Sequence, residues 1–501
     1  MEGLMRVGFG LVGLAVLVGI TWLFSDNKRR VSWSLVGTGL VLQIVFAALV
    51  LLGDSFLTWL GAASPTLRLW LPQLAIAGWV VTALLVFSAP LVGRFGGGGE
   101  EVAAGIRRRW ALPVAGVATV LTAPYFGAVI GAISRGFVGL LAFTGEGASF
   151  IFGDFTDTSR FGFIFAFQVL PTIIFFASLM SVLYHVGLMQ RIVESMAWGM
   201  TRLMRVSGAE TLAVSANTFV GQTEAPLVIR PYVPQMTQSE LLTVMVSGMA
   251  TIAGGVLGAF VILLGGDDPA QQAFFARHLI TASVMAAPAT IVIAKILKPE
   301  TETPLTMGAV RVDVEKTTAN VIDAAASGAA EGLKLALNVG AMLLAFIALI
   351  ALLNWPLVWL GQATGLEEVL GRPTDLSALL GILLAPLAWI IGVPWQEAST
   401  VGGLIGTKVV LNEFVAYVQL SEILRGNVDG VALGPQGTLI ATYALCGFAN
   451  FSSIAIQIGG VGGLAPTRRA ELAQLGMRAV LGGSIVTMMT ATIAGVLTNL
   501  A

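Results

Sequence analysis

The stretch NTFVGQTEAPLVIRPY, Asn217 to Tyr232, decides how the rest of the chain is interpreted. It carries a carboxylate, Glu224, together with two prolines and several amide and hydroxyl side chains, and it lies between long apolar segments. A charged side chain at membrane depth costs about 2.5 to 3.5 kcal/mol even on lenient insertion scales. Glu224 is therefore expected to face a protein-lined or water-filled cavity, which makes the stretch a candidate binding site. The alternative is an ordinary loop between two spans.

The composition is that of a polytopic α-helical membrane protein. Of the 501 residues, 56% are hydrophobic and 11% are charged, whereas soluble domains carry about 25% charged residues. The formal net charge of -1 gives no excess of positive charge for a nucleic-acid partner. The single cysteine, Cys446, excludes an intramolecular disulfide and lies in an apolar run. We therefore expect a multi-pass protein of the plasma membrane, which in a bacterium is the inner membrane.

Several windows of about 20 apolar residues are long enough to cross a bilayer. They lie near 5–24, 33–53, 70–93, 111–130, 163–186, 240–264, 278–297, 336–354, 437–460 and 478–500. If the N-terminus is outside, most of the basic residues between these windows fall in cytoplasmic loops, as the positive-inside rule requires. The basic groups concerned include Lys28 to Arg30, Arg107 to Arg109, Arg202 with Arg205, Lys298, and Arg468 with Arg469.

A second polar interruption resembles the first. After Pro394 the chain carries small residues and then Lys408, Asn412 and Glu413. Each interruption is followed by a span that opens with small and polar residues, GMATIAGG at 248–255 and GFANFSSIAIQIGG at 447–460. The topology above lets the first interruption enter from the cytoplasm and the second from outside. Such oppositely oriented, interrupted segments are typical of inverted-repeat secondary transporters.

The predicted fold is thus an all-α polytopic membrane protein, an inverted-repeat transporter with two re-entrant helical hairpins and interrupted spans. The expected domains are N-terminal spans at 1–130, including an inserted helix pair at about 54–130, a first repeat at 131–300 and a second repeat at 301–501. The hairpins are expected at about 208–232 and 395–418.

Broken helices free backbone carbonyls, which in a membrane must find ligands or water. Around the first interruption Asn217, Val220, Thr251 and Ile252 can supply an amide oxygen, a hydroxyl and carbonyls. These hard oxygen ligands suit an alkali cation. The sequence therefore predicts a cation site that needs no carboxylate.

The remaining polar groups suit a different ligand. Glu224 and Glu413 can accept hydrogen bonds, and Gln222 and Asn450 can both donate and accept them. A neutral, polar organic molecule with several donors and acceptors fits this set better than an ion. ATP-driven transport is not indicated, because the chain lacks a GxxxxGK[ST] motif. No histidine lies near Ser453 in the sequence to activate it, so an enzyme is not predicted.

At Gly221 to Tyr232, GQTEAPLVIRPY, the chain resembles the concentrative nucleoside transporter family. Five further stretches share the resemblance: GASFIFGD at 147–154, FAFQVLPTIIFFASLMSVLYHVGLMQ from Phe165, SGMATIAGGVLGA from Ser247, LIGTKVVLNEFVAY from Leu404 and CGFANFSSIAIQIGG from Cys446. The resemblance implies cation-driven uptake of nucleosides, uridine-like and of broad range, by a homotrimer. Each protomer would have a scaffold and a transport domain that moves in an elevator-like way.

The resemblance also implies roles for particular residues. The residues implied to bind the nucleobase are Gln222, Thr223, Glu224 and Val256. Those implied to bind the ribose are Glu413, Asn450 and Ser453, with Phe448 packed beside the sugar. Asn217, Val220, Thr251 and Ile252 match the sodium positions. No other cofactor is implied.

Two alternatives stay open on this sequence. Coupling to protons would use Glu224 or Glu413 as the titrating group, and a passive channel or facilitator would need no coupling ion. The chain also departs from the family's compact bacterial pattern at about 54–130, where an inserted helix pair would preserve the topology.

Overall fold

The computed structural model describes residues 2–53, 125–307, 318–370, 373–428 and 430–498, with four isolated positions between 54 and 124. The predicted window at 70–93 and the Arg107 to Arg109 cluster lie outside the described residues, as does almost all of the predicted helix pair. Contacts divide the chain into two compact units, one made of 1–44 with 134–499 and the other of 45–133 with the last two residues. All predicted site residues belong to the first unit.

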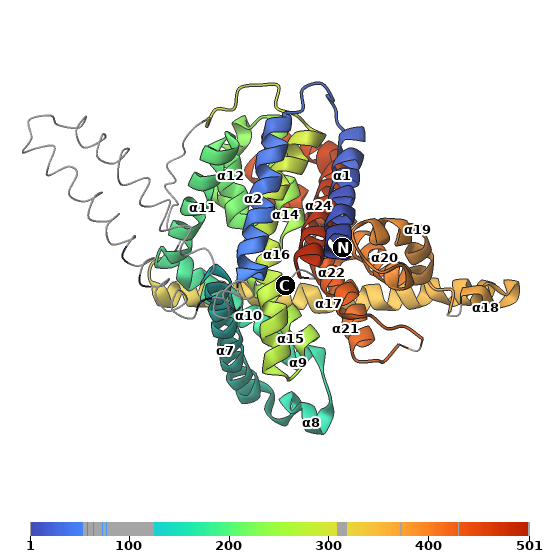
Figure 1. The fold of residues 1–501 in the computed structure, drawn as a ribbon. Helices are drawn as coiled ribbons and strands as arrows, with labels where there is room; N and C mark the ends of the chain where they lie inside the picture. Colours follow the sequence, from blue (N-terminus) through green and yellow to red (C-terminus); the bar gives the residue numbers. More distant parts are fainter. Residues whose placement is uncertain are drawn as a thin grey trace, which may run out of the picture. The chain divides into compact units, whose positions relative to one another are not determined.

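Helices make up the described part of the chain (Figure 1). The helices of the first half are α1 (Glu2–Leu23), α2 (Trp33–Leu51), α7 (Phe126–Phe152), α8 (Thr158–Phe161), α9 (Phe165–Gln168), α10 (Leu170–His185), α11 (Leu188–Met204), α12 (Gly208–Asn217), α13 (Ala225–Val228), α14 (Gln238–Ala250), α15 (Gly254–Gly265) and α16 (Pro269–Leu297). Those of the second half are α17 (Val321–Thr364), α18 (Leu366–Leu370), α19 (Leu376–Ile390), α20 (Trp395–Val410), α21 (Glu413–Leu424), α22 (Pro435–Leu445), α23 (Phe451–Leu464) and α24 (Arg469–Thr498). Three short 3-10 turns, η3 (Gly153–Thr156), η4 (Val233–Gln235) and η5 (Pro466–Arg468), connect them.

Within the described residues, 8 helical segments are long and apolar enough to cross a membrane, or up to 9 if the bent pair α19 and α20 counts as one span. The predicted windows at 5–24, 33–53, 163–186, 240–264, 278–297, 336–354 and 478–500 coincide with such segments. The window at 437–460 does not form one helix, because α22 and α23 are separated by Cys446 to Asn450. The segment Phe126–Thr156 also passes as a span, although only its first residues were predicted. Arg135 and Glu146 interrupt its apolar run, which explains the omission.

The two halves repeat the same order of elements. In the first, α12 leads through a non-helical tip to α13, and a broken pair, α14 and α15, precedes the long α16. In the second, α20 leads through a tip at Leu411 to α21, and a broken pair, α22 and α23, precedes the long α24. The halves also interlock, because α13 packs against α23 and α21 packs against α15. The predicted repeat is therefore present in the structure.

The breaks of the two repeats touch. Gly447 lies in the second break, and a Cβ atom placed on it would come 2.8 Å from the carbonyl oxygen of Met249 and 2.9 Å from the Thr487 methyl group. Met249 is the second-last residue of α14. Only glycine allows this approach, since a Cβ at such distances would force the chains apart. The two broken spans that follow the predicted interruptions thus meet within one unit.

Helix α17 is 44 residues long and packs along α10 through two glycines. A Cβ on Gly328 or Gly332 would come within 2.8 Å of atoms of α10. The rest of α17 exposes large apolar side chains, including Leu344, Trp355 and Trp359. Exposed apolar surface of this size marks contact with lipid or with another protein.

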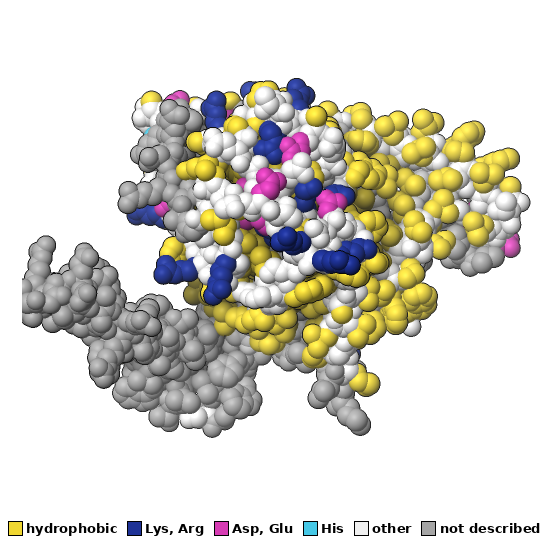
Figure 2. All heavy atoms as spheres, turned by 90° about the horizontal axis from the view of Figure 1, so that it is seen from above, with side chains coloured by type: hydrophobic (Ala, Val, Ile, Leu, Met, Phe, Trp, Pro, Cys, Tyr) yellow, Lys and Arg dark blue, Asp and Glu magenta, His cyan; other side chains and the backbone are white. Residues whose placement is uncertain are grey.

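Charged side chains gather on the face that carries the connection between α1 and α2 (Figure 2). There Asp26 accepts hydrogen bonds from Arg478 of α24 and, at 3.0 Å, from Lys298. The backbone N–H of Asp26 donates to the carbonyl of Leu297 at 3.0 Å. These partners, Arg478 first, hold the pKa of Asp26 below its usual value. The connection after α1 and the end of α16, both predicted to be cytoplasmic, therefore lie together.

Candidate functional site

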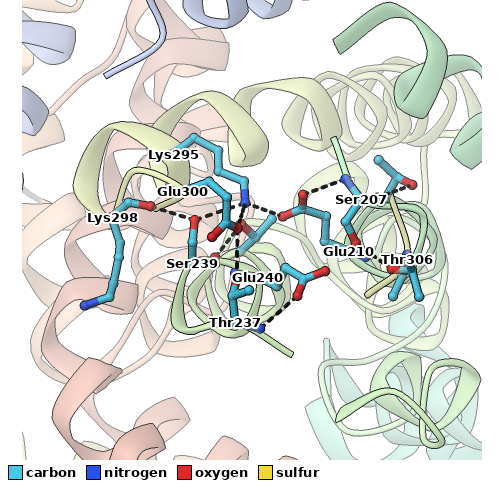
Figure 3. A network of polar contacts seen from close by, with 12 residues as sticks. Ser207, Glu210, Thr237, Ser239, Glu240, Lys295, Lys298, Glu300 and Thr306 are labelled. Carbon is cyan, nitrogen blue, oxygen red and sulfur yellow. Dashed lines mark hydrogen bonds and ion pairs between the residues drawn. The ribbon is translucent and has the colours of Figure 1, made fainter. Parts of the chain in front are cut away.

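The first hairpin begins in a buried polar network (Figure 3). Ser207 caps α12, since its hydroxyl accepts from the N–H of Glu210 at 3.4 Å while Glu210 Oε1 accepts from the N–H of Ser207 at 3.0 Å. The second oxygen of Glu210 lies 2.9 Å from Lys295 Nζ, and this lysine also reaches Glu300 at 3.2 Å. Glu210 and Lys295 are both buried, so each charge depends on the other for compensation.

The same network caps the helix that follows the hairpin. Thr237 accepts from the N–H of Glu240 at 3.1 Å, and the Glu240 carboxylate accepts from the N–H of Thr237 at 2.8 Å. Thr237 also donates to Glu300 at 2.9 Å, and Lys295 donates to Ser239 at 3.0 Å. The starts of α12 and α14 are thereby fixed to one another and to the end of α16 (Figure 3).

The tip of the first hairpin lies against the break between α14 and α15. Asn217 Nδ2 donates to Ser247 Oγ at 2.6 Å, and Thr251 Oγ1 donates to the carbonyl of Ser247 at 2.9 Å. The N–H of Gly254 donates to the carbonyl of Phe219 at 2.9 Å. Two of the four predicted cation ligands, Asn217 and Thr251, are thus joined through one serine. The other two, Val220 and Ile252, lie in the same two segments.

One buried oxygen at this junction has no partner. Asn217 is 1% exposed, and its Oδ1 atom accepts no hydrogen bond within the part of the chain that the structure describes. Helices α12 and α14 both end here, and the carbonyls at helix C-termini carry a partial negative charge. A buried, unpaired amide oxygen beside two such ends fits a cation, which would supply the missing partner.

The first hairpin reaches the second repeat through Gln222. Its Nε2 atom donates to Ser453 Oγ at 3.2 Å, and its Oε1 atom accepts from Gln457 Nε2 at 3.0 Å. Gln457 also donates to the carbonyl of Met245 at 2.9 Å. Gln457 was not predicted as a site residue. It lies four residues after Ser453 on α23, so the helical repeat could have placed it on the same face.

The second hairpin contributes a buried carboxylate. Glu413 is 4% exposed, and its Oε2 atom accepts from Asn450 Nδ2 at 2.8 Å. Asn450 is also the N-cap of α23, because its Oδ1 atom accepts from the N–H of Ser453 at 2.9 Å. The hydrogen bonds therefore run continuously from Glu413 through Asn450 and Ser453 to Gln222. Four predicted residues from both repeats meet in one chain of contacts.

The other predicted substrate residues do not belong to this chain of hydrogen bonds. Glu224 is exposed, and it accepts a hydrogen bond at 3.0 Å from Thr223 of its own hairpin. Val256 is buried in α15, and Phe448 is half-buried in the second break. The sequence suggests Glu224 as the counterpart of Glu413 across the repeat, but the hydrogen-bonded link between the hairpins passes through Gln222.

Models of known protein families match three stretches of the chain. The model for the N-terminus of Na+ dependent nucleoside transporters matches residues 12–67, a nucleoside recognition (Gate) model matches 166–267, and the model for the C-terminus of Na+ dependent nucleoside transporters matches 278–495.

Individual proteins agree with these models. The nucleoside permease NupC of Helicobacter pylori is 35% identical over 497 residues, covering 98% of this chain and 98% of the relative. Sodium/nucleoside cotransporter 1 of Mus musculus is 40% identical over 367 residues, covering 71% of this chain and 54% of the relative. The structure of CNTnw in an inward-facing substrate-bound state has a TM-score of 0.74 at 36% identity and covers 99% of both chains.

Proposed function

Because the chain belongs to the concentrative nucleoside transporter family, we propose that it imports nucleosides by symport with sodium. It is a multi-pass protein of the plasma membrane, and its relatives are transporters rather than enzymes. The sequence is thus assigned to the family that it resembles. The coupling ion, the residue roles and the movement are the parts that we propose.

The observation that carries sodium coupling is the unpaired Oδ1 atom of Asn217. This atom is buried where two helices end, and nearby Thr251 adds a hydroxyl. With carbonyls from Val220 and Ile252, the junction offers oxygen ligands alone, which suits an alkali cation. No carboxylate belongs to this set, so bound sodium would bring a net positive charge. The membrane potential would then drive its entry.

The nucleoside is proposed to bind along the contacts that join the hairpins. Gln222, Thr223 and Glu224, with Val256, would bind the base. Glu413, Asn450 and Ser453 would bind the ribose hydroxyls, with Phe448 beside the sugar. In support, Gln222 bonds to Ser453 and Asn450 bonds to Glu413, so these groups already converge without a ligand. A ligand that joins base and sugar would replace contacts between the two repeats.

The movement is proposed to be elevator-like, with the two hairpins and broken helices travelling against α10 and α17. Relatives have been captured in inward-facing and outward-facing states, which supports a large displacement in this family. A homotrimer is proposed as the assembly. The exposed apolar side chains along α17 provide surface for a partner protomer.

Uptake of labelled uridine into proteoliposomes tests the coupling. With an imposed sodium gradient and a negative interior, we expect accumulation above the external concentration, by a factor of about 50 per 100 mV for one co-transported charge. Full accumulation after replacement of sodium by choline at fixed pH would show proton coupling. Equilibration without accumulation would show a passive facilitator.

The cation site has its own test. Asn217→Ala removes the unpaired oxygen and should raise the sodium concentration for half-maximal uptake at least tenfold, which corresponds to about 1.4 kcal/mol. The uridine affinity at saturating sodium should stay near the wild-type value. An unchanged sodium dependence would remove Asn217 from the site.

A further inference from the structure

A second buried lysine, Lys408, forms no ion pair with a carboxylate in the part of the chain that the structure describes. Lys408 is 1% exposed in the last turn of α20. Its Nζ atom donates to the carbonyl of Ala444 at 2.8 Å and to Thr487 Oγ1 at 2.9 Å. Among the described residues, no carboxylate forms an ion pair with it, unlike Lys295, which has Glu210 and Glu300. Lys408 interacts electrostatically with the buried carboxylate of Glu413 but forms no ion pair with it. Burial of a charge without a close partner of opposite charge is costly, so its retention in this position calls for an explanation.

The position of Lys408 follows from the repeat. It lies at the end of α20, as Asn217 lies at the end of α12. Its acceptor Ala444 lies in the last turn of α22, as Ser247, the partner of Asn217, lies in the last turn of α14. Each residue therefore connects the end of a hairpin's first arm to the end of the broken helix beside it.

The two junctions differ in what they hold. Both bring two helix C-termini together, so both concentrate partial negative charge. The first holds an unpaired amide oxygen, which leaves room in its bonding for a free cation. The second holds the Lys408 ammonium, which donates directly to a carbonyl at the end of α22. A positive charge is thus already supplied in the second repeat by the chain itself.

We propose that Lys408 is a tethered cation that takes, in the second repeat, the place that sodium takes in the first. The inference rests on the proposed function, because it requires sodium at the Asn217 junction. Lys408 keeps the end of α20 joined to the end of α22 whether or not sodium is bound. One mobile cation is then enough for two cation-dependent junctions, and the transporter couples each nucleoside to a single sodium ion.

Lys408→Ala and Lys408→Met separate this role from simple packing. Alanine leaves a space beside the Ala444 carbonyl that a small cation can enter, whereas methionine fills the space without charge. For the wild type we expect a sodium Hill coefficient near one and one charge moved per uridine. For Lys408→Ala we expect at least tenfold lower uptake at low sodium. High sodium should restore it with a Hill coefficient approaching two and a second charge per uridine.

Methylammonium provides a second readout. Added to Lys408→Ala, it should restore uptake at low sodium, with the Hill coefficient back near one. It should leave Lys408→Met unrestored. The matched control Thr487→Val removes the hydroxyl acceptor but keeps the ammonium, so its sodium Hill coefficient should remain near one.

If Lys408→Ala does not transport at all, the proposal is tested by melting temperatures measured in detergent with and without each cation. A rise with sodium or methylammonium that exceeds the wild-type rise supports the tethered cation, and equal rises contradict it. Transport by Lys408→Ala with wild-type cooperativity and no response to methylammonium also contradicts it. A wild-type protein that transports without sodium would instead overturn the proposed function, so the two failures are distinguishable.

Discussion

Individual side chains at the junction of the repeats have two tasks at once. Asn450 caps α23 through its oxygen and donates to Glu413 through its nitrogen. The amide nitrogen and the amide oxygen of Gln222 both form hydrogen bonds with residues of the other repeat. A nucleoside bound as proposed would compete for these same atoms, so its binding would affect the helix end that Asn450 caps.

The glutamates can be tested without disturbing these bonds. Glu413→Gln keeps an oxygen that can accept from Asn450 but loses the charge, so we expect intact expression and loss of uridine uptake by at least a hundredfold. Glu224→Gln should have the same result. The control Glu422→Gln lies on the exposed end of α21, beside Arg425, and should transport normally. Wild-type uptake in both site variants would refute their assignment to the substrate.

Gln457 should act on affinity through Gln222. Gln457→Leu removes the bonds to Gln222 and to the Met245 carbonyl, each of which contributes about 0.5 to 1.5 kcal/mol. We expect the KM for uridine to rise about tenfold while the sodium dependence is unchanged. Gln436→Leu is the matched control, because it removes another glutamine bond to a carbonyl, that of Gly392. A KM that is equal in the two variants would deny Gln457 this role.

At the scale of elements, the interrupted helices could be predicted and their partners could not. The tips around Glu224 and Glu413 stand out because polar residues and prolines or glycines interrupt apolar windows. Asn450 and Ser453 belong to the polar and small residues of 447–460, which open a predicted span. Lys408 donates a hydrogen bond to Thr487, which lies 79 residues away on α24, and no local pattern indicates that contact. The span at Phe126–Thr156 was mostly missed because charged residues lower its apparent hydrophobicity.

The buried pair that starts the first hairpin yields a prediction at this scale. Glu210→Gln and Lys295→Met each leave one charge without its main partner, which should destabilise the protein by about 3 to 5 kcal/mol. The double variant removes both of these charges and leaves only Glu300, which is partly exposed and keeps its hydrogen bond from Thr237, without its lysine. It should therefore be more stable than the sum of the two changes. Melting temperatures of the wild type, the two single variants and the double variant form a double-mutant cycle. Simple additivity would show that the two charges do not depend on each other.

At the scale of the whole molecule, charged side chains gather on the face that carries the connection between α1 and α2 (Figure 2). The loop after α1 and the end of α16 share one face, and Asp26 joins them to α24. This agrees with the predicted alternation of basic loops. The repeat and the family could be predicted from the sequence, and the roles of the site residues stay predictions. The contacts that join the halves required the structure, because they connect residues far apart in the chain.

Asp26 predicts how stability depends on pH. Its folded pKa lies below the ordinary value of 3.8, so its ion pairs stabilise the fold above that value. The stabilisation is lost as the pH falls through the folded pKa. The melting temperature of the wild type should exceed that of Asp26→Asn by a constant margin between pH 7 and pH 5, and the margin should shrink below about pH 4. A margin that is constant down to pH 3 would mean that the ion pairs contribute nothing.

The bare backbone at Gly447 has a consequence for how the two ligands communicate. The segment with Thr251, proposed to bind the cation, and the segment with Asn450, proposed to bind the sugar, adjoin at Gly447, which has no side chain. A methyl group at position 447 would force these two segments apart. Because the backbone at Gly447 lies so close to Met249, neither break can shift without displacing the other. A cation and a nucleoside bound as proposed would therefore be mechanically coupled through the missing side chain of Gly447.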